Sequence, residues 1–251
     1  MSDFNRGYPR NMTAGVADMS VDAGLRAFML GVYNKVGLGL VLSAAMAYLT
    51  SSVPAVTAML FRVTYDGRLV GYTGLGALVA FAPLMILLFS GFAMRSISPR
   101  ASGAIYWVIT ALIGASLGSL AFLYTGASIA TTFLVTATAF GALSLVGYTT
   151  KKDLTGFGSF LIMGLVGLII AIFVSMFLHS AMMEFMISVF GVLIFAGLIA
   201  YDTQRLKATY YQLGGNEAAI GVATNFGALS LYLDFINLFR FLLYFMGGSR
   251  R

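Results

Sequence analysis

The chain alternates between long apolar stretches and short polar segments. Uninterrupted hydrophobic runs of about twenty residues recur along it, which is the length of helix that crosses a hydrocarbon core. The strands of a membrane β-barrel would instead alternate apolar and polar residues over about ten positions. The pattern therefore predicts an all-α integral membrane protein with seven transmembrane helices. The predicted helices are 32–52, 71–93, 103–124, 127–149, 157–179, 182–204 and 226–246.

The polar segments predict the domain organisation and the orientation. Residues 1–27 have no continuous apolar core and no small-residue cleavage site, so they are interpreted as a short cytoplasmic tail. Residues 28–251 then form a single seven-helix transmembrane domain. With the N-terminus inside, the cytoplasmic segments hold Arg6, Arg10, Arg26, Lys35, Arg95, Arg100, Lys151, Lys152, Arg205 and Lys207, against Arg62, Arg68, Arg250 and Arg251 opposite. The positive-inside rule therefore places the N-terminus in the cytoplasm.

Composition excludes several classes of protein. Of the 251 residues, 59% are hydrophobic and 10% are charged, whereas soluble domains have about 45–50% and about 25%. The absence of cysteine excludes disulfides, thiol nucleophiles and thiolate metal sites. The net charge of +6 is explained by membrane topology, so no nucleic-acid partner is expected. Nucleotide-binding loops, serine-hydrolase elbows and metalloprotease motifs are also missing, and we expect neither an enzyme nor a bound cofactor.

An aspartate stands inside the last predicted helix. Asp234 lies in LSLYLDFINLF, where an acidic side chain costs about 2.5–3.5 kcal/mol on membrane-insertion scales. Ser230 is four residues before it and Asn237 three residues after it, so the three side chains share one helix face. This polar stripe is predicted to face the interior of the bundle, where Asp234 needs a partner or a proton.

A second aspartate ends the preceding helix. Asp202 lies in AGLIAYDTQRLK, at the negative end of the helix dipole, where a carboxylate is disfavoured. Two interpretations remain open. Asp202 is either a structural residue, namely a surface carboxylate paired with Arg205 three positions on or a local backbone cap, or part of a buried site in which it faces Asp234.

The buried alternative has a definite chemistry. Two carboxylates in contact at low dielectric do not both ionise cheaply, so the pair would share one proton and titrate as a unit. Loss of that proton leaves hard oxygen anions on Asp202 and Asp234, which suit transient binding of Ca²⁺. Arg95, after the second apolar stretch, is a candidate latch that pairs with Asp202 in one conformation and releases it in another.

A sequence of six residues occurs twice in the chain. FGALSL occurs at 140–145 and again at 226–231, which is compatible with a trace of an internal repeat. Six residues of common membrane composition are weak support for a repeat, and a shared packing need is the simpler interpretation.

Two segments together carry a family resemblance. At FAGLIAYDTQRLK (195–207) and GALSLYLDFINLF (227–239), the chain resembles the bacterial branch of the Bax inhibitor-1 family. The stretches 24–40, 124–154 and 158–171 also resemble members of this family. The resemblance implies a fold in which helix 7 is central and helices 1–6 wrap around it. It also implies a location in the bacterial plasma (inner) membrane.

The resemblance also implies a function, a pH-sensitive Ca²⁺ leak. It assigns the family's aspartate pair to Asp202 and Asp234 and its latch to Arg95. The chain departs from the family because the stretch 71–93 contains no acidic residue and the lysine-rich tail of eukaryotic members is missing.

The leading hypothesis is a passive channel that stays closed while the pair holds its proton and Arg95 is latched. Its partners would be the lipid bilayer, Ca²⁺ and H⁺. Two alternatives remain open. One is an interaction protein that modulates a membrane-bound AAA protease and is cytoprotective, and the other is a Ca²⁺/H⁺ exchanger.

Overall fold

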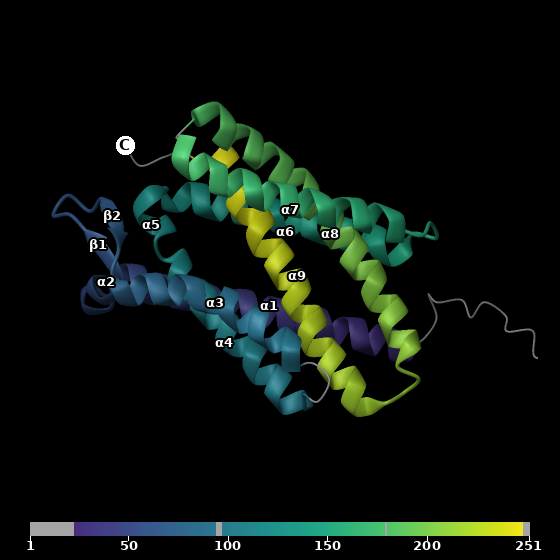
Figure 1. The fold of residues 1–251 in the computed structure, drawn as a ribbon. Coiled ribbons are helices and arrows are strands. Elements are labelled where there is room, and N and C mark those ends of the chain that lie inside the picture. Colours follow the sequence, from purple (N-terminus) through teal and green to yellow (C-terminus); the bar gives the residue numbers. More distant parts are fainter. Residues whose placement is uncertain (1–22, 94–96, 179, 248–251) are drawn as a thin grey trace, which may run out of the picture.

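The computed structural model describes residues 23–93, 97–178 and 180–247, with the side chains of 91–93 left out. Its elements follow one another along the chain as shown in Figure 1. They are α1 (Ala23–Ser52), α2 (Pro54–Leu60), β1 (Phe61–Val63), β2 (Leu69–Tyr72), α3 (Gly74–Ala93), α4 (Pro99–Leu117), α5 (Leu120–Leu123), α6 (Gly126–Thr149), α7 (Thr155–Leu178), α8 (Ala181–Gln212) and α9 (Glu217–Met246).

The long helices form two groups with one helix between them. Figure 1 shows α1, α3 and α4 on one side and α6, α7 and α8 on the other, with α9 crossing obliquely between them. The contacts agree, because α4 packs on α1 and α3, α8 packs on α6 and α7, and α9 packs on α1, α4, α6 and α8. The most buried of the candidate spans is α9. The wrapping of all six other spans around this helix stays a prediction.

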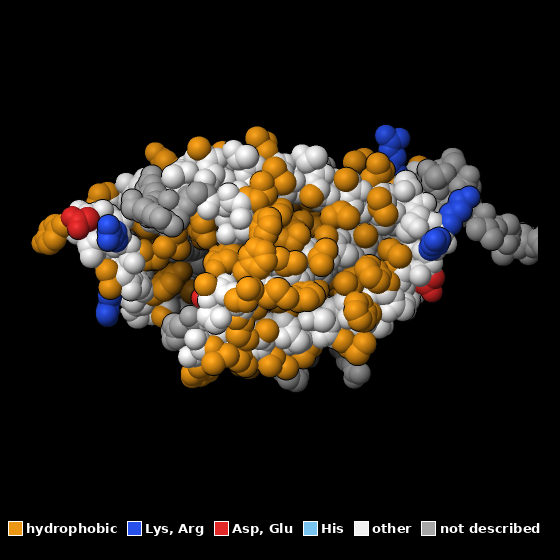
Figure 2. Space-filling model, turned by 90° about the horizontal axis from the view of Figure 1, so that it is seen from above, with side chains coloured by type: hydrophobic (Ala, Val, Ile, Leu, Met, Phe, Trp, Pro, Cys, Tyr) orange, Lys and Arg blue, Asp and Glu red, His pale blue; other side chains and the backbone are white. Residues whose placement is uncertain are grey.

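Six helices of the described chain are long and apolar enough to cross a membrane: α1, α4 with α5, α6, α7, α8 and α9. Figure 2 shows hydrophobic side chains over the middle of the visible face and charged side chains near its two ends. This confirms an all-α membrane protein. The apolar part of α3, Gly74–Ser90, is shorter and contains Pro83, which removes one helical hydrogen bond. The seventh span therefore remains a prediction.

Three helices continue beyond the apolar stretches that predicted them. Helix α1 begins at Ala23 instead of residue 32, α8 ends at Gln212 instead of 204, and α9 begins at Glu217 instead of 226. These ends are amphipathic, so hydropathy falls while the helices continue and pack on one another. The rings of Phe28 and Tyr210, for example, lie 5.4 Å apart. The start of α1 lies inside the segment 1–27 predicted as a tail, and residues 1–22 are outside the described chain.

The two longer linkers are also more ordered than the pattern predicted. The segment after α1 contains α2 and an antiparallel hairpin, in which Phe61 of β1 pairs with Tyr72 of β2. The connection between α8 and α9 is a tight turn, where Gly214 and Gly215 have φ of 56° and 83°. Such angles favour glycine because a Cβ atom would clash. Asn216 then caps α9 by accepting a hydrogen bond from the Ala219 backbone at 3.1 Å.

These connections define the two ends of the bundle. The N-terminal end holds Ala23, Pro99, the 150–154 loop and the turn between α8 and α9. The hairpin end holds β1 and β2. Both can be followed in Figure 1.

Candidate aspartate-pair site

The two predicted aspartates meet between α8 and α9. These helices are antiparallel neighbours joined by the glycine turn, and they make the most extensive helix–helix contact of the fold. Asp202 on α8 and Asp234 on α9 are buried, with 8% and 6% of their surface exposed. Their carboxyl groups are near enough to interact with each other across the contact between the two helices. A carboxylate only accepts hydrogen bonds, so a bond between the two groups requires one proton.

Asp202 has further partners on both sides. The Ser230 hydroxyl of α9 donates a hydrogen bond to Asp202 Oδ2. Arg205 Nη1 lies 3.8 Å from Asp202 Oδ1, one helical turn along α8, and its side chain is 64% exposed. The ion pair with Arg205 is therefore present, but Asp202 is not the surface residue of the first interpretation, because it is buried between α8 and α9. Because exposed pairs contribute only about 0–1 kcal/mol, the ion pair with Arg205 is readily broken.

Asp234 is less well satisfied than Asp202. Among the described residues, its Oδ2 atom is buried and has no hydrogen-bonding partner. Asn237, expected on the same polar stripe, donates from Nδ2 to the Leu233 carbonyl oxygen of its own helix at 2.9 Å. A buried acceptor without a donor costs free energy, about 1–3 kcal/mol. The stripe thus divides, with Ser230 joining the aspartate pair and Asn237 satisfied within α9.

A cavity of about 290 Å³ opens beside Asp202, between α3, α8 and α9. Its polar lining comes from Asp202, Arg205, Thr209 and Ser230, and the rest is apolar, including Leu87 of α3. The lining reaches toward the N-terminal end of the bundle, so Asp202 is approached from that end. The predicted latch, Arg95, lies just beyond α3 and outside the described residues.

Two residues near the site were missed because they lie at and just beyond the end of the predicted helix 182–204. Gln204 donates to the Lys152 carbonyl oxygen at 2.7 Å and accepts from the Leu154 backbone at 2.8 Å. Lys207, only 8% exposed, donates to the Tyr148 carbonyl oxygen, and its Nζ lies 4.8 Å from the centre of the Tyr148 ring.

Lys207 therefore places its charge at the carbonyl end of α6, where a cation is favourable. The sequence interpretation had counted it as a loop charge. The available signal was spacing, since Lys207 lies four residues after the buried Thr203 and on the same helix face.

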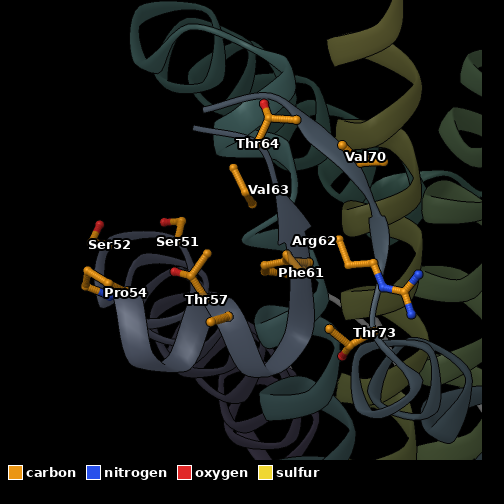
Figure 3. A pocket seen from close by; sticks show the side chains of 11 residues that line it. Ser51, Ser52, Pro54, Thr57, Phe61, Arg62, Val63, Thr64, Val70 and Thr73 are labelled. Carbon is orange, nitrogen blue, oxygen red and sulfur yellow. The ribbon is translucent and has the colours of Figure 1, made fainter. Parts of the chain in front are cut away.

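A larger cavity, of about 660 Å³, lies at the hairpin end. Figure 3 shows it between α2 and the hairpin, with the guanidinium of Arg62 directed away from Thr57. Most of the hydroxyl groups that line it donate to backbone carbonyl oxygens. Thr57 donates to the Thr50 carbonyl oxygen at 2.8 Å, for example, and Ser51 to that of Tyr48 at 3.3 Å. Since a binding site needs convergent polar groups, size alone does not make this cavity the functional site.

The donor chemistry of the aspartate pair limits what it holds. Within the described part of the chain, no three or more His, Cys, Asp or Glu side chains gather where they could bind a metal ion. The pair offers carboxylate and hydroxyl oxygens, which suit a hard cation. Ca²⁺ takes about six to eight oxygen ligands, so two carboxylates would bind it only together with hydroxyls, carbonyls or water.

Comparisons with known proteins cover the whole described chain. A family model described as "Inhibitor of apoptosis-promoting Bax1" matches residues 25–251. A protein of Caulobacter vibrioides is 68% identical over 250 residues, covering 100% of both chains. The inner membrane protein YbhL of Escherichia coli K12 is 40% identical, covering 91% of this chain and 94% of its own. A membrane protein of Streptococcus pyogenes serotype M1 is 36% identical, covering 91% and 95% respectively.

Proposed function

Since the chain belongs to the Bax inhibitor-1 family, we propose that it is a pH-sensitive Ca²⁺ leak channel gated by Asp202 and Asp234. The observation that carries this proposal is the meeting of two buried carboxyl groups between α8 and α9. An ionisable pair inside a membrane bundle is costly, and such pairs mark ion and proton pathways in membrane proteins.

The negative charge of the aspartate pair links the release of a proton to the binding of a cation. With one shared proton, Asp202 and Asp234 carry a single negative charge and are held together by a hydrogen bond. Release of that proton to water in the adjacent cavity leaves two negative charges that repel each other. A divalent cation balances them, so proton release and Ca²⁺ binding favour each other. The Ser230 hydroxyl donates to Asp202 and so helps to orient that carboxyl group.

The orientation that we propose places the N-terminal end of the bundle in the cytoplasm, following the excess of Lys and Arg there. The cavity beside Asp202 would then open toward the cytoplasm. The inner membrane is the proposed location, in line with the printed name of the Escherichia coli relative. Arg95 is proposed as the latch that competes for Asp202, and it follows α3, one wall of this cavity.

The test is Ca²⁺ flux into dye-loaded proteoliposomes between pH 5 and pH 8. We expect the wild-type flux to change with pH. In Asp202→Asn, Asp234→Asn and the double variant the flux should depend less on pH, because an amide does not ionise. Asp66→Asn is the matched control, since Asp66 is exposed in the hairpin turn and should leave the profile unchanged.

Two outcomes would contradict the proposal. No flux above that of empty liposomes would leave the aspartates as structural groups, and the role as a modulator of a membrane-bound AAA protease would become the better hypothesis. Uphill Ca²⁺ movement driven by an imposed proton gradient would instead identify an exchanger. A leak only equilibrates Ca²⁺, so measuring accumulation against its gradient separates the two mechanisms.

A further inference from the structure

Another cavity, of about 270 Å³, lies between α1, α4, α5, α6 and α9, in the half of the bundle nearer the hairpin end. Its lining along α1 runs from Leu40 to Ser51, a rise of about 16 Å at about 1.5 Å per residue. The cavity is therefore elongated and follows the helix axis. It lies between the two groups of helices that Figure 1 shows, and α9 forms one of its walls.

The interior of this cavity is apolar. Leucine, isoleucine, phenylalanine, alanine and glycine make up most of the lining. Ser43, a polar member of the lining, already donates to the Thr110 carbonyl oxygen at 2.9 Å and shares a hydrogen bond with the Tyr232 hydroxyl at 2.6 Å. Ser51 donates to the Tyr48 carbonyl oxygen at 3.3 Å. Because a buried water molecule needs about two to four polar partners, the cavity suits an apolar occupant better than water.

The exposed residues of the lining show where the cavity opens. They are Ala44 and Tyr48 of α1 and Phe133 of α6, and Tyr48 is 73% exposed. Both helices are candidate membrane spans. Val41, three residues before Ala44 and on the same helix face, is also apolar and exposed. The mouth therefore lies between α1 and α6 and opens sideways into the hydrocarbon of the membrane.

The walls of the cavity belong to different parts of the bundle. The Phe133 ring of α6 packs on the rings of Phe235 and Phe239 of α9, with centroids 5.4 Å and 6.2 Å apart. Ile236 of α9 also lines the cavity and is 6% exposed. Side chains around a void lack contacts on one side, and an occupant would supply those contacts. A molecule in the cavity would thus touch α1, α6 and α9 at once.

Tyr48 gives the mouth a polar group. It lies four residues before the end of α1 at Ser52, about 6 Å from that end along the helix axis. Tyrosines near the ends of spanning helices place the ring in the apolar layer and the hydroxyl at the level of the lipid headgroups. Among the residues that the structure describes, none forms a hydrogen bond with the Tyr48 hydroxyl. This hydroxyl can therefore donate to a lipid.

We propose that this cavity binds one acyl chain of a membrane phospholipid, with the Tyr48 hydroxyl donating to the ester carbonyl oxygen of that chain. A hydrocarbon chain matches the elongated, apolar shape and enters from the bilayer without crossing water. It would hold α1, α6 and α9 together and so join the two groups of helices. The cavity shares no lining residue with the one beside Asp202, so this inference stands whether or not the protein conducts Ca²⁺.

The first test narrows the mouth at Ala44. Ala44→Phe adds a ring to the lining, whereas the control Ala45→Phe adds the same ring at an exposed position outside the lining. Each protein is titrated in detergent with a diacyl phosphatidylglycerol, and its unfolding temperature is measured at each lipid concentration. We expect a saturable rise for wild type and Ala45→Phe, and its loss in Ala44→Phe. Equal rises in all three proteins, or no rise in wild type, would overturn the site.

Tyr48→Phe tests the headgroup end with a smaller change, because it keeps the ring and removes only the hydroxyl. Each protein is titrated with the diester lipid and with a diether analogue, which has the same chains and headgroup but no carbonyl. Wild type should bind the diester about threefold to tenfold more tightly, as one hydrogen bond predicts, and Tyr48→Phe should bind both equally. Equal binding by wild type would overturn the contact with Tyr48.

Fluorescence locates the chain on the protein. Trp107 is the only tryptophan of the sequence, so a Trp107→Phe background allows one probe at a time. Phe133→Trp places the probe in the lining, and Leu134→Trp places it at a position 66% exposed and outside the lining. A phospholipid brominated on its acyl chain, at low ratio to protein in detergent, should quench the first probe more strongly. Ala44→Phe should remove this difference. Equal quenching of both probes without Ala44→Phe would overturn the site.

Discussion

The side-chain amide of Gln204 donates a hydrogen bond to the Lys152 carbonyl oxygen at 2.7 Å, which joins α8 to the loop before α7. The same side chain accepts from the Leu154 backbone at 2.8 Å. Gln204 lies two residues after Asp202, so the helix that carries the first aspartate is held in register with its neighbour. Two other side chains of this part of α8 also contact neighbouring helices. Asp202 accepts a hydrogen bond from Ser230 of α9, and Lys207 donates one to the Tyr148 carbonyl oxygen of α6.

Gln204→Ala should therefore destabilise the protein. Removing two hydrogen bonds is expected to lower the free energy of unfolding by about 1–3 kcal/mol. The measurement is thermal or denaturant unfolding in detergent. Gln212→Ala is the matched control, because Gln212 is exposed at the end of the same helix. Equal stability of the two variants would show that the 150–154 loop needs no support from α8.

Asn225 joins α9 to α1 and α4. It accepts a hydrogen bond from Lys35 Nζ of α1 and donates to the Pro99 carbonyl oxygen at 2.9 Å and to Ser102 Oγ at 2.8 Å. Asn225→Leu should lower the free energy of unfolding by about 2–4 kcal/mol, because it removes the acceptor of the Lys35 ammonium group and the two hydrogen bonds that Asn225 donates to α4. Asn34→Leu, at an exposed position of α1, is the control and should have little effect.

A double-mutant cycle checks the cause. In a Lys35→Met background the ammonium group is already gone, so Asn225→Leu should cost less than it does alone, with a coupling free energy of about 1–3 kcal/mol. Strict additivity would mean that Lys35 and Asn225 contribute independently, contrary to the contact between them.

Gly147 and Gly141 of α6 allow a comparison within one helix. A Cβ atom at Gly147 would lie 2.2 Å from the Ala200 carbonyl oxygen, whereas one at Gly141 would meet nothing within 4 Å. Gly147→Ala should therefore force α6 away from α8 and cost about 1–3 kcal/mol. Gly141→Ala should be neutral or stabilise by up to about 1 kcal/mol, since alanine favours helix. The ratio of folded to unfolded protein across a denaturant series measures both, and a reversed order would refute the close contact.

Much of the helical fold could be predicted because apolar runs report burial in lipid. The prediction failed at the ends of α1, α8 and α9, where hydropathy falls but side chains such as Phe28 and Tyr210 still pack on each other. It also failed between α1 and α3. There the pattern suggested a linker, while Phe61 and Tyr72 pair across a short hairpin whose register depends on local turn geometry.

The site was predicted in part, and for a physical reason. An acid inside an apolar helix stands out from sequence because of its cost, so Asp202 and Asp234 could be singled out. Their distance could not, because it depends on how α8 folds back on α9 at the glycine turn. Ser230 and Asn237 share a helix face, yet only Ser230 reaches a partner on another helix. That difference is set by neighbouring helices, which spacing along one helix does not describe.

The Arg205 guanidinium has a consequence for whatever approaches the aspartate pair. It lines the cavity beside Asp202, 3.8 Å from that carboxyl group, and is mostly exposed. The protein therefore has a positively charged side chain of its own beside Asp202, in the cavity that leads to it. Under the proposed function, an arriving cation would first have to displace this positive charge, which remains close by and would return when the cation leaves. Occupancy of Asp202 would then be set by exchange between two cations, one mobile and one covalently attached.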